Sequence, residues 1–286
     1  MFTTLDLTTG YWQIPVAEKD RRKTAIATPF GAFQFKVMPF GLSGAPASFQ
    51  RLMDRLLQGC EQFAAAYIDD FVIFSCGWKE HLVHLQTVLT RLQSAGLTVK
   101  LKKSKFAYTS CEYLGHIVGN RVIKPVLDKV EAVRAFPRPE TKTAVRTFLG
   151  LTGYYRRFMP NFASVAAPLT DLTKKSMPNS VVWNDKCEDA FKVLKDTLCS
   201  DPVLNSPDFK KGFIVQTDAS DRGVGAVLTQ VGGDGQEHPE GYFSRKRLPR
   251  EQRYSTIEKE YLAIKLSLGC IQGIPSWKKF CCADRP

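Results

Sequence analysis

The sequence lacks the features that would place it outside the cell or in a membrane. No apolar run approaches the roughly 20 residues that a helix needs to cross a bilayer. The N-terminus has no basic region followed by an apolar core, as a secretory signal would. The 8 cysteines are scattered without a Cys-x-x-Cys pair, so reduced thiols are expected rather than disulfides. We therefore expect an intracellular protein, cytoplasmic or nuclear, that is neither secreted nor membrane-bound.

Histidine is scarce as well, with 4 residues in the whole chain. Two of them, His81 and His84, lie three residues apart on a predicted helix. Cys76 is the only soft ligand nearby, and zinc sites in proteins are usually completed by four ligands. We therefore predict no zinc site at these histidines.

Acidic residues are outnumbered, with 28 Asp plus Glu against 40 Lys plus Arg and a formal net charge of +12. The basic residues are spread along the whole chain, and their densest cluster in the first half covers residues 100–105. Because Lys and Arg neutralise phosphates and release counterions, this charge favours a phosphate-rich partner. A soluble protein that is simply basic remains the alternative, and the cluster at 100–105 fits a nucleic-acid contact and a solvated face equally well.

What the chain does contain is a carboxylate pair in an apolar setting. Asp69 and Asp70 lie between two β-favouring runs in residues 63–74, the pattern of a hairpin with charges at its turn. An isolated pair of this kind usually just faces water. Asp6, however, ends a second apolar strand, and a buried carboxylate is costly or shifts its pKa unless a cation or hydrogen bonds compensate it. The two acidic strand ends are therefore predicted to share a metal site.

With 286 residues, of which 44% are hydrophobic, the chain is long enough for two or more domains. Pro137 and Pro139 indicate a first boundary at 136–141, and 168–207 is predicted to be a connector. Apolar periodicity predicts helices at 46–57, 80–95, 125–136, 142–151, 169–174, 185–198 and 254–268. Strands are predicted at 30–37, 113–118, 122–123, 213–218, 224–230 and 241–244, with a possible further strand at 280–283.

Several motifs together resemble the palm of reverse transcriptases of the gypsy class of long-terminal-repeat retrotransposons. They are Leu-Asp-Leu-Thr-Thr-Gly-Tyr-Trp-Gln-Ile from residue 5, Met-Pro-Phe-Gly-Leu from 38, Ala-Pro-Ala-Ser-Phe-Gln from 45, and Tyr-Ile-Asp-Asp from 67. Tyr-Leu-Gly-His from 113 resembles the primer grip of this family, and residues 148–158 resemble its thumb and connection. Thr-Asp-Ala-Ser from 217, with Glu-Lys-Glu from 258, resembles the start of the attached ribonuclease H domain.

The resemblance implies an α+β fold. It places a reverse-transcriptase palm at 1–120, thumb and connection helices at 121–207, and a truncated ribonuclease H-like α/β domain at 208–286. The palm and thumb would combine an antiparallel sheet with packed helices. The resemblance also implies that the chain is a fragment of a Pol polyprotein without most of the fingers, so that polymerisation is weakened. Whether another chain supplies the missing parts, and the oligomeric state, are left open.

The resemblance also implies site residues. Asp6, Asp69 and Asp70 match the catalytic carboxylates, which bind two Mg²⁺ ions roughly 4 Å apart, with Mn²⁺ as a possible substitute. Tyr11 matches the residue that selects against a 2′-hydroxyl, and Phe40 the position beside the incoming nucleotide. Further substrate contacts fall on Gln50, Tyr67 and Gly115.

In the ribonuclease H part, Asp218 and Glu260 match the first two catalytic metal ligands. Glu258 lies two residues from Glu260, on a different helical face. For the third acid only Asp284 is available.

These matches imply an RNA-directed DNA polymerase fragment fused to a partial ribonuclease H that cleaves RNA in RNA–DNA hybrids. The implied partners are an RNA template, a DNA primer, an RNA–DNA hybrid and deoxynucleoside triphosphates, with no membrane. One alternative is a catalytically inactive nucleic-acid-binding remnant, which would keep the fold and the basic surface. Another is a pseudogene product without function.

Overall fold

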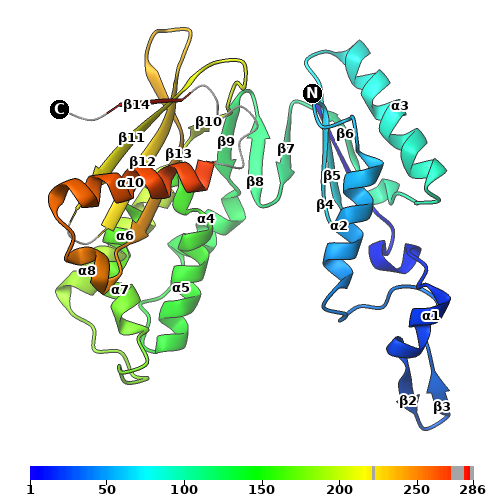
Figure 1. Ribbon diagram of the computed structural model, residues 1–286, viewed down its shortest axis with the longest axis horizontal. Coiled ribbons are helices and arrows are strands. Elements are labelled where there is room, and N and C mark those ends of the chain that lie inside the picture. Colours follow the sequence, from blue (N-terminus) through cyan, green and yellow to red (C-terminus); the bar gives the residue numbers. More distant parts are fainter. Residues whose placement is uncertain (221–222, 272–279, 284–286) are drawn as a thin grey trace. The chain divides into compact units, whose positions relative to one another are not determined.

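The computed structural model describes residues 1–220, 223–271 and 280–283 (Figure 1). Contacts divide the chain into two compact units, Met1–Asn120 and Arg121–Pro286. Both contain helices and antiparallel strands, which confirms the α+β prediction. Among the described residues, every helix is too short or too polar to pass through a bilayer. The finer division of the second unit at residue 207 stays a prediction.

The first unit is built on a four-stranded sheet with the order β4-β5-β1-β6. Its strands are β1 (Phe2–Asp6), β4 (Ala64–Tyr67), β5 (Asp70–Phe74) and β6 (Lys105–Tyr108). The pairing of β4 with β5 confirms the hairpin predicted around the acidic pair. Helices α2 (Ala45–Leu56) and α3 (Trp78–Ser94) pack on this sheet. The core between them includes Phe49, Met53, Phe71 and Ile73, all fully buried.

Shorter elements complete the first unit. They are η1 (Gly10–Gln13), α1 (Glu18–Arg21), η2 (Arg22–Thr24), β2 (Ile26–Thr28), β3 (Gly31–Phe33), η3 (Leu101–Lys103), β7 (Ser110–Tyr113) and β8 (His116–Gly119). The single strand predicted at 113–118 is wrong, because the chain turns at Leu114 and Gly115 and pairs β7 with β8. Both turn residues have left-handed backbones, with φ of 45° and 67°. Leucine rarely adopts this conformation, so the sequence carried little turn signal.

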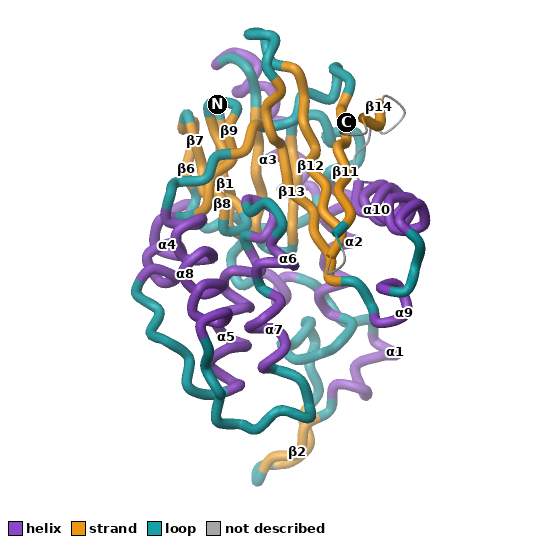
Figure 2. The backbone as a smooth tube through the Cα atoms, turned by 90° about the vertical axis from the view of Figure 1, so that its left-hand side faces the viewer, coloured by secondary structure: helices purple, strands orange, loops and turns teal. Residues whose placement is uncertain are grey.

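The second unit contains a sheet with the order β13-β12-β11-β14. Strands β11 (Phe213–Ala219), β12 (Gly223–Val231) and β13 (Glu237–Lys246) are antiparallel, and β14 (Phe280–Ala283) runs parallel to β11. All four were predicted from the sequence. Helix α10 (Thr256–Ile271) packs against β11 and β12 (Figure 2), and the short helices α6 (Phe162–Val165) and η4 (Arg156–Phe158) lie against β13.

A helical layer completes the second unit. It consists of α4 (Leu127–Arg134), α5 (Lys142–Tyr154), α7 (Ala167–Leu172) and α8 (Asp185–Cys199), which pack on one another, with α9 (Pro249–Gln252) further along the chain. Beside them, β9 (Val122–Pro125) pairs with β10 (Leu204–Asn205). Thr141 and Asn184 accept backbone hydrogen bonds at the starts of α5 and α8, as helix-capping residues do. The prolines at 137 and 139 separate α4 from α5.

Two buried groups, one in each unit, have pKa values displaced in opposite directions. In the first, His81 is fully buried and hydrogen-bonded to Thr3 and Ser75, and its burial lowers its pKa. In the second, Glu240 lies at a bulge where β13 departs from register with β12. It is 3% exposed, its Oε2 atom has no hydrogen-bond partner among the described residues, and burial raises its pKa to about 7, with a smaller effect of Asp208.

We expect opposite pH responses from these two groups. The unfolded chain binds more protons at His81, so this residue costs stability as the pH falls below about 6.5. The folded chain binds more protons at Glu240, so stability on the order of 3 kcal/mol is lost as the pH rises from about 4.5 through 7. Hydrogen exchange of each unit between pH 5 and 8, compared with His81→Gln and Glu240→Gln variants, measures both effects. Wild type and variant with the same pH dependence would contradict the assignment for that residue.

Candidate active sites

A strained turn presents the acidic pair at the end of the β4–β5 hairpin. Ile68 has a φ of 54°, a conformation that a β-branched residue rarely adopts. Gln50 of α2 braces this turn: its Oε1 accepts a hydrogen bond from the Ile68 N–H at 2.8 Å, and its Nε2 donates to Ala66 O at 3.0 Å. The same Nε2 donates to Asp54 at 2.9 Å. Both polar atoms of the Gln50 amide thus make hydrogen bonds within the protein. The contact of Gln50 with substrate stays a prediction.

Two of the three predicted carboxylates are paired across the sheet. In the register of β1 with β5, Asp6 lies directly opposite Asp70, and Tyr67 lies opposite Asp70 on the other side. Side chains directly opposite each other project from the same face with Cβ atoms about 5 Å apart. The structure therefore brings Asp6 and Asp70 together, as the sequence predicted for two acidic strand ends. Tyr67 is 54% exposed, which leaves its ring open to a ligand.

The third carboxylate, Asp69, lies in the turn between β4 and β5 and is packed more tightly than Asp70. Its Oδ1 atom is buried and, within the described part of the chain, has no hydrogen-bond partner. The carboxylate lies against the backbone of Gly10, where the methyl group of an alanine would overlap Oδ1. A glycine is therefore needed at position 10 because the Asp69 carboxylate leaves no room for a side chain there, and not because of the backbone angles of Gly10. Nothing in the local sequence indicated this contact, since 59 positions separate the two residues.

The electrostatics of the carboxylates are those of a site with more negative than positive charge. Burial raises the pKa of Asp69, and the neighbouring charges of Asp70 and Asp6 raise it further. Burial and then Asp6 raise the pKa of Asp70, whereas Lys103 lowers it. Since like charges in a partly buried site repel, a cation bound here would relieve the repulsion.

This donor set fits a hard divalent cation, for which carboxylate oxygens are the preferred ligands. The buried Oδ1 of Asp69 supplies an acceptor that still needs a partner. Across the described residues, however, no three His, Cys, Asp or Glu side chains are already arranged as a metal cage. The carboxylates must therefore turn toward an ion when one binds.

Aromatic rings lie beside the acidic turn. Tyr11 contacts Phe40 edge-on with 5.5 Å between ring centroids and Phe49 with 5.2 Å, while Trp12 lies 5.8 Å from Phe40. Phe49 is buried, but Phe40 is 63% exposed. Burial raises the pKa of Tyr11, and Asp69 raises it further. Tyr11 is thus anchored on the core through Phe49 and close enough to Asp69 to feel its charge.

Asp6 and Asp70 also line a cavity of about 280 Å³. It is lined by Thr4, Leu5, Asp6, Asp70, Phe71, Lys103, Lys105, Glu112, Tyr113, Leu114 and Gly115. Burial raises the pKa of Tyr113 to about 12, with Asp70 the next cause. The β7–β8 turn therefore brings Gly115, predicted to contact substrate, to the same cavity as two of the carboxylates. The lysines at this cavity belong to the basic cluster for which the sequence left two interpretations open.

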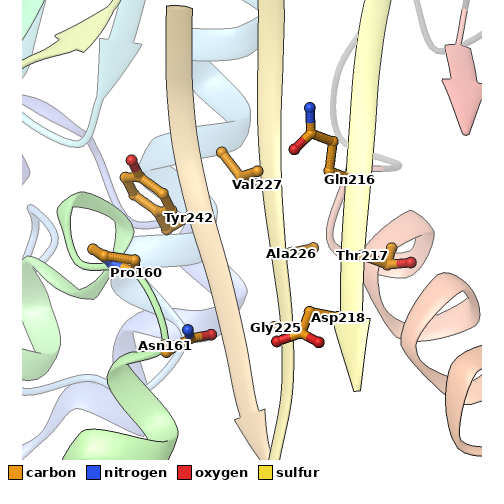
Figure 3. A pocket seen from close by; sticks show the side chains of 9 residues that line it. All are labelled: Pro160, Asn161, Gln216, Thr217, Asp218, Gly225, Ala226, Val227 and Tyr242. Atoms are coloured by element: carbon orange, nitrogen blue, oxygen red, sulfur yellow. The ribbon is translucent and has the colours of Figure 1, made fainter. Parts of the chain in front are cut away.

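In the second unit, Asp218 lines a small pocket of about 70 Å³ (Figure 3). Asp218 pairs with Gly225 across the sheet, and Asn161 lies so close to Gly225 that its Oδ1 would contact a side chain there. Gln216 and Tyr242 also line the pocket, so it offers a carboxylate, two amides and a phenol. Such groups bind cations and hydrogen-bonding ligands. The role of metal ligand predicted for Asp218 stays a prediction.

The sequence also predicted Glu260 and Asp284 for this site, and the structure describes only the first of them. Glu260 is half-buried on α10, the helix that packs against β11, but it is not among the residues that line the Asp218 pocket. Glu258 accepts hydrogen bonds from the N–H and hydroxyl of Ser255. These bonds hold Glu258 at the start of α10, and the choice of Glu260 as a metal ligand stays a prediction. Asp284 lies outside the described residues.

Comparison with known proteins identifies both units. Residues 1–118 match the family model of reverse transcriptase (RNA-dependent DNA polymerase). Residues 183–273 match that of the RNase H-like domain found in reverse transcriptase. A solved structure of the foamy viral protease-reverse transcriptase in complex with an RNA/DNA hybrid has a TM-score of 0.87 over 99% of this chain and 38% of the other, at 22% identity. Fold and matches together define a reverse transcriptase with an RNase H-like domain, families that generally use divalent metal ions.

Curated relatives narrow the class. The Pol polyproteins of the Drosophila melanogaster transposons 297 and gypsy are 43% and 41% identical over 92% and 95% of this chain, covering 24% and 27% of their own length. The Tf2-3 polyprotein of Schizosaccharomyces pombe is 35% identical over 94% of this chain and 20% of its own length. The chain belongs to the gypsy class of long-terminal-repeat retrotransposon Pol proteins. It spans about a quarter of the length of these relatives.

Proposed function

We propose that the first unit carries the site of an RNA-directed DNA polymerase and the second carries part of a ribonuclease H. The observation that carries the first part is the set of Asp6, Asp69 and Asp70: two are opposed across the sheet and the third has a buried oxygen without a partner among the described residues. The whole activity is a proposal because the chain is a fraction of its relatives' length.

In this proposal Asp6, Asp69 and Asp70 hold two Mg²⁺ ions, with Mn²⁺ as a substitute. When bound, the ions supply the charge that activates a primer 3′-hydroxyl and stabilises the triphosphate. Tyr11, fixed on Phe49, limits the room beside the sugar and so selects deoxynucleotides. The exposed rings of Phe40 and Tyr67 offer surfaces on which a base can pack.

The partners are those of this reaction: an RNA template, a DNA primer, deoxynucleoside triphosphates and, for the second unit, an RNA–DNA hybrid. A net charge of +12 supports binding of polyanions. We place the protein inside the cell, in the cytoplasm or nucleus, where such templates occur. In the second unit Asp218 and Glu260 are the proposed metal ligands, and Asp284 is a candidate third.

The deciding experiment gives the purified chain a primed RNA template with deoxynucleotides in Mg²⁺, in Mn²⁺ and in a chelator, and then repeats the assay with ribonucleotides. We expect extension that needs the metal and prefers deoxynucleotides. Labelled RNA in an RNA–DNA hybrid, with Asp218→Asn as the control, tests the ribonuclease H part. Binding without extension, weakening steeply with salt, would favour instead the inactive nucleic-acid-binding remnant.

A further inference from the structure

The turn that carries Lys103 is fastened to the backbone of Asp6. The Lys100 N–H donates to Asp6 O at 2.8 Å, and the Asp6 N–H donates to the Ser104 hydroxyl at 3.4 Å. That hydroxyl in turn donates to Lys100 O at 3.0 Å, so the residues on either side of η3 are hydrogen-bonded to each other. Both backbone groups of Asp6 are thus held by the residues that flank η3, so the position of Lys103 is fixed relative to this carboxylate.

The ammonium of Lys103 lies where a cation would otherwise compensate the carboxylates. Its Nζ is 3.6 Å from Asp6 Oδ2, and in the described part of the chain this is the only ion pair that Asp6, Asp69 or Asp70 makes. Lys105 lines the same cavity without an ion pair to Asp6, so proximity to the cavity alone does not produce the contact.

We propose that Lys103 is an internal cation that neutralises the polymerase carboxylates while they hold no metal and opposes the binding of a divalent ion that arrives without nucleotide. The inference rests on the proposed polymerase site. Ammonium and metal ion carry the same sign and seek the same oxygens, so each weakens the other's interaction. A nucleoside triphosphate brings negative charge that compensates both, which couples metal loading to nucleotide binding.

The side chains of Lys103 and Asp6 are 59% and 31% exposed, so solvent screens the interaction and the effect is moderate. We expect Lys103→Met to bind Mn²⁺ about fivefold more tightly than wild type in the absence of nucleotide. Lys103→Arg keeps the charge and should bind as wild type does. Lys105→Met removes a lysine from the same cavity but no ion pair with Asp6, and should change the affinity less than about twofold.

The experiment measures free Mn²⁺ by electron paramagnetic resonance during titration of the whole chain, with and without a deoxynucleoside triphosphate. The Asp69→Asn, Asp70→Asn chain gives the binding at all other sites, which is subtracted. Tighter binding by Lys103→Met alone, together with a smaller gain on adding nucleotide, supports the inference. Equal or weaker binding by Lys103→Met overturns it while the metal site stands. If wild type and Lys103→Met both bind no more Mn²⁺ than the double variant, the metal site and this inference fail together.

Discussion

A chain carrying Asp69→Asn and Asp70→Asn is expected to lose primer extension by at least about a thousandfold without becoming less stable. Asparagine has the shape of aspartate but no charge, so the site loses two of its three anionic ligands. The pKa values of Asp69 and Asp70 are raised by burial and by mutual repulsion, so neutral side chains relieve an unfavourable interaction in the folded state. Lost activity with unchanged or higher stability distinguishes a functional site from a structural one.

The measurement pairs extension rates in Mg²⁺ with urea unfolding of the same preparations. Asp20→Asn is the matched control: Asp20 is a partly exposed carboxylate of the same unit whose 2.6 Å ion pair with Lys23 lies in the α1–η2 segment. It should extend primers as wild type does. Extension that survives the double replacement would show that the carboxylates do not form the polymerase site. A large fall in stability would show that the pair has a structural role instead.

The hairpin and its carboxylates could be predicted because their signals are local. Two β-favouring runs flank Asp69 and Asp70, and the structure pairs those runs as β4 and β5. The nearness of Asp6 could be predicted as well, because an unpaired acid at the end of an apolar strand needs a compensating partner. Register then determined the geometry, placing Asp6 directly opposite Asp70.

The supports of the site could not be predicted, because they come from distant parts of the chain. The Gln50 side chain hydrogen-bonds a backbone 18 positions away, and the Ser104 hydroxyl accepts from the Asp6 N–H across 98 positions. Gly10 is small because Asp69 packs against it, a tertiary contact without a local pattern. The lysine cluster remained ambiguous for the same reason: only the fold shows that Lys103 meets Asp6 while Lys105 does not.

The second unit shows the same limit more strongly. Its strands β11, β12 and β13 follow from turns and alternation, and Asp218 stands at the end of the predicted run. The relation between Asp218 and Glu260 depends on how α10 packs on β11, which no pattern in either segment specifies. The family resemblance favoured Glu260 over Glu258, and this choice stays a prediction. The hydrogen bonds that Glu258 accepts from Ser255 are visible only in the fold.

Replacing Phe148 by alanine is expected to lower the free energy of unfolding of the second unit by about 3–5 kcal/mol. Phe148 is fully buried on α5, with its ring centroid 5.4 Å from Phe136 and 4.6 Å from Phe191. These rings come from three segments of the helical layer, so the truncation opens a cavity where α5, α8 and the chain after α4 meet. Close-packed aromatic surroundings cannot easily collapse into such a cavity.

Hydrogen exchange of the whole chain, followed by mass spectrometry of its peptides, separates the two units in this test. Protection should fall in α5 and α8 and stay unchanged in β1 and β5, because the two units have separate buried clusters. Val193→Ala, at a 46% exposed position of α8, controls for truncation without a buried cavity and should change stability little. Equal loss of protection in both units would mean that they unfold as one, and that the core of the second unit also stabilises the strands that carry Asp6 and Asp70.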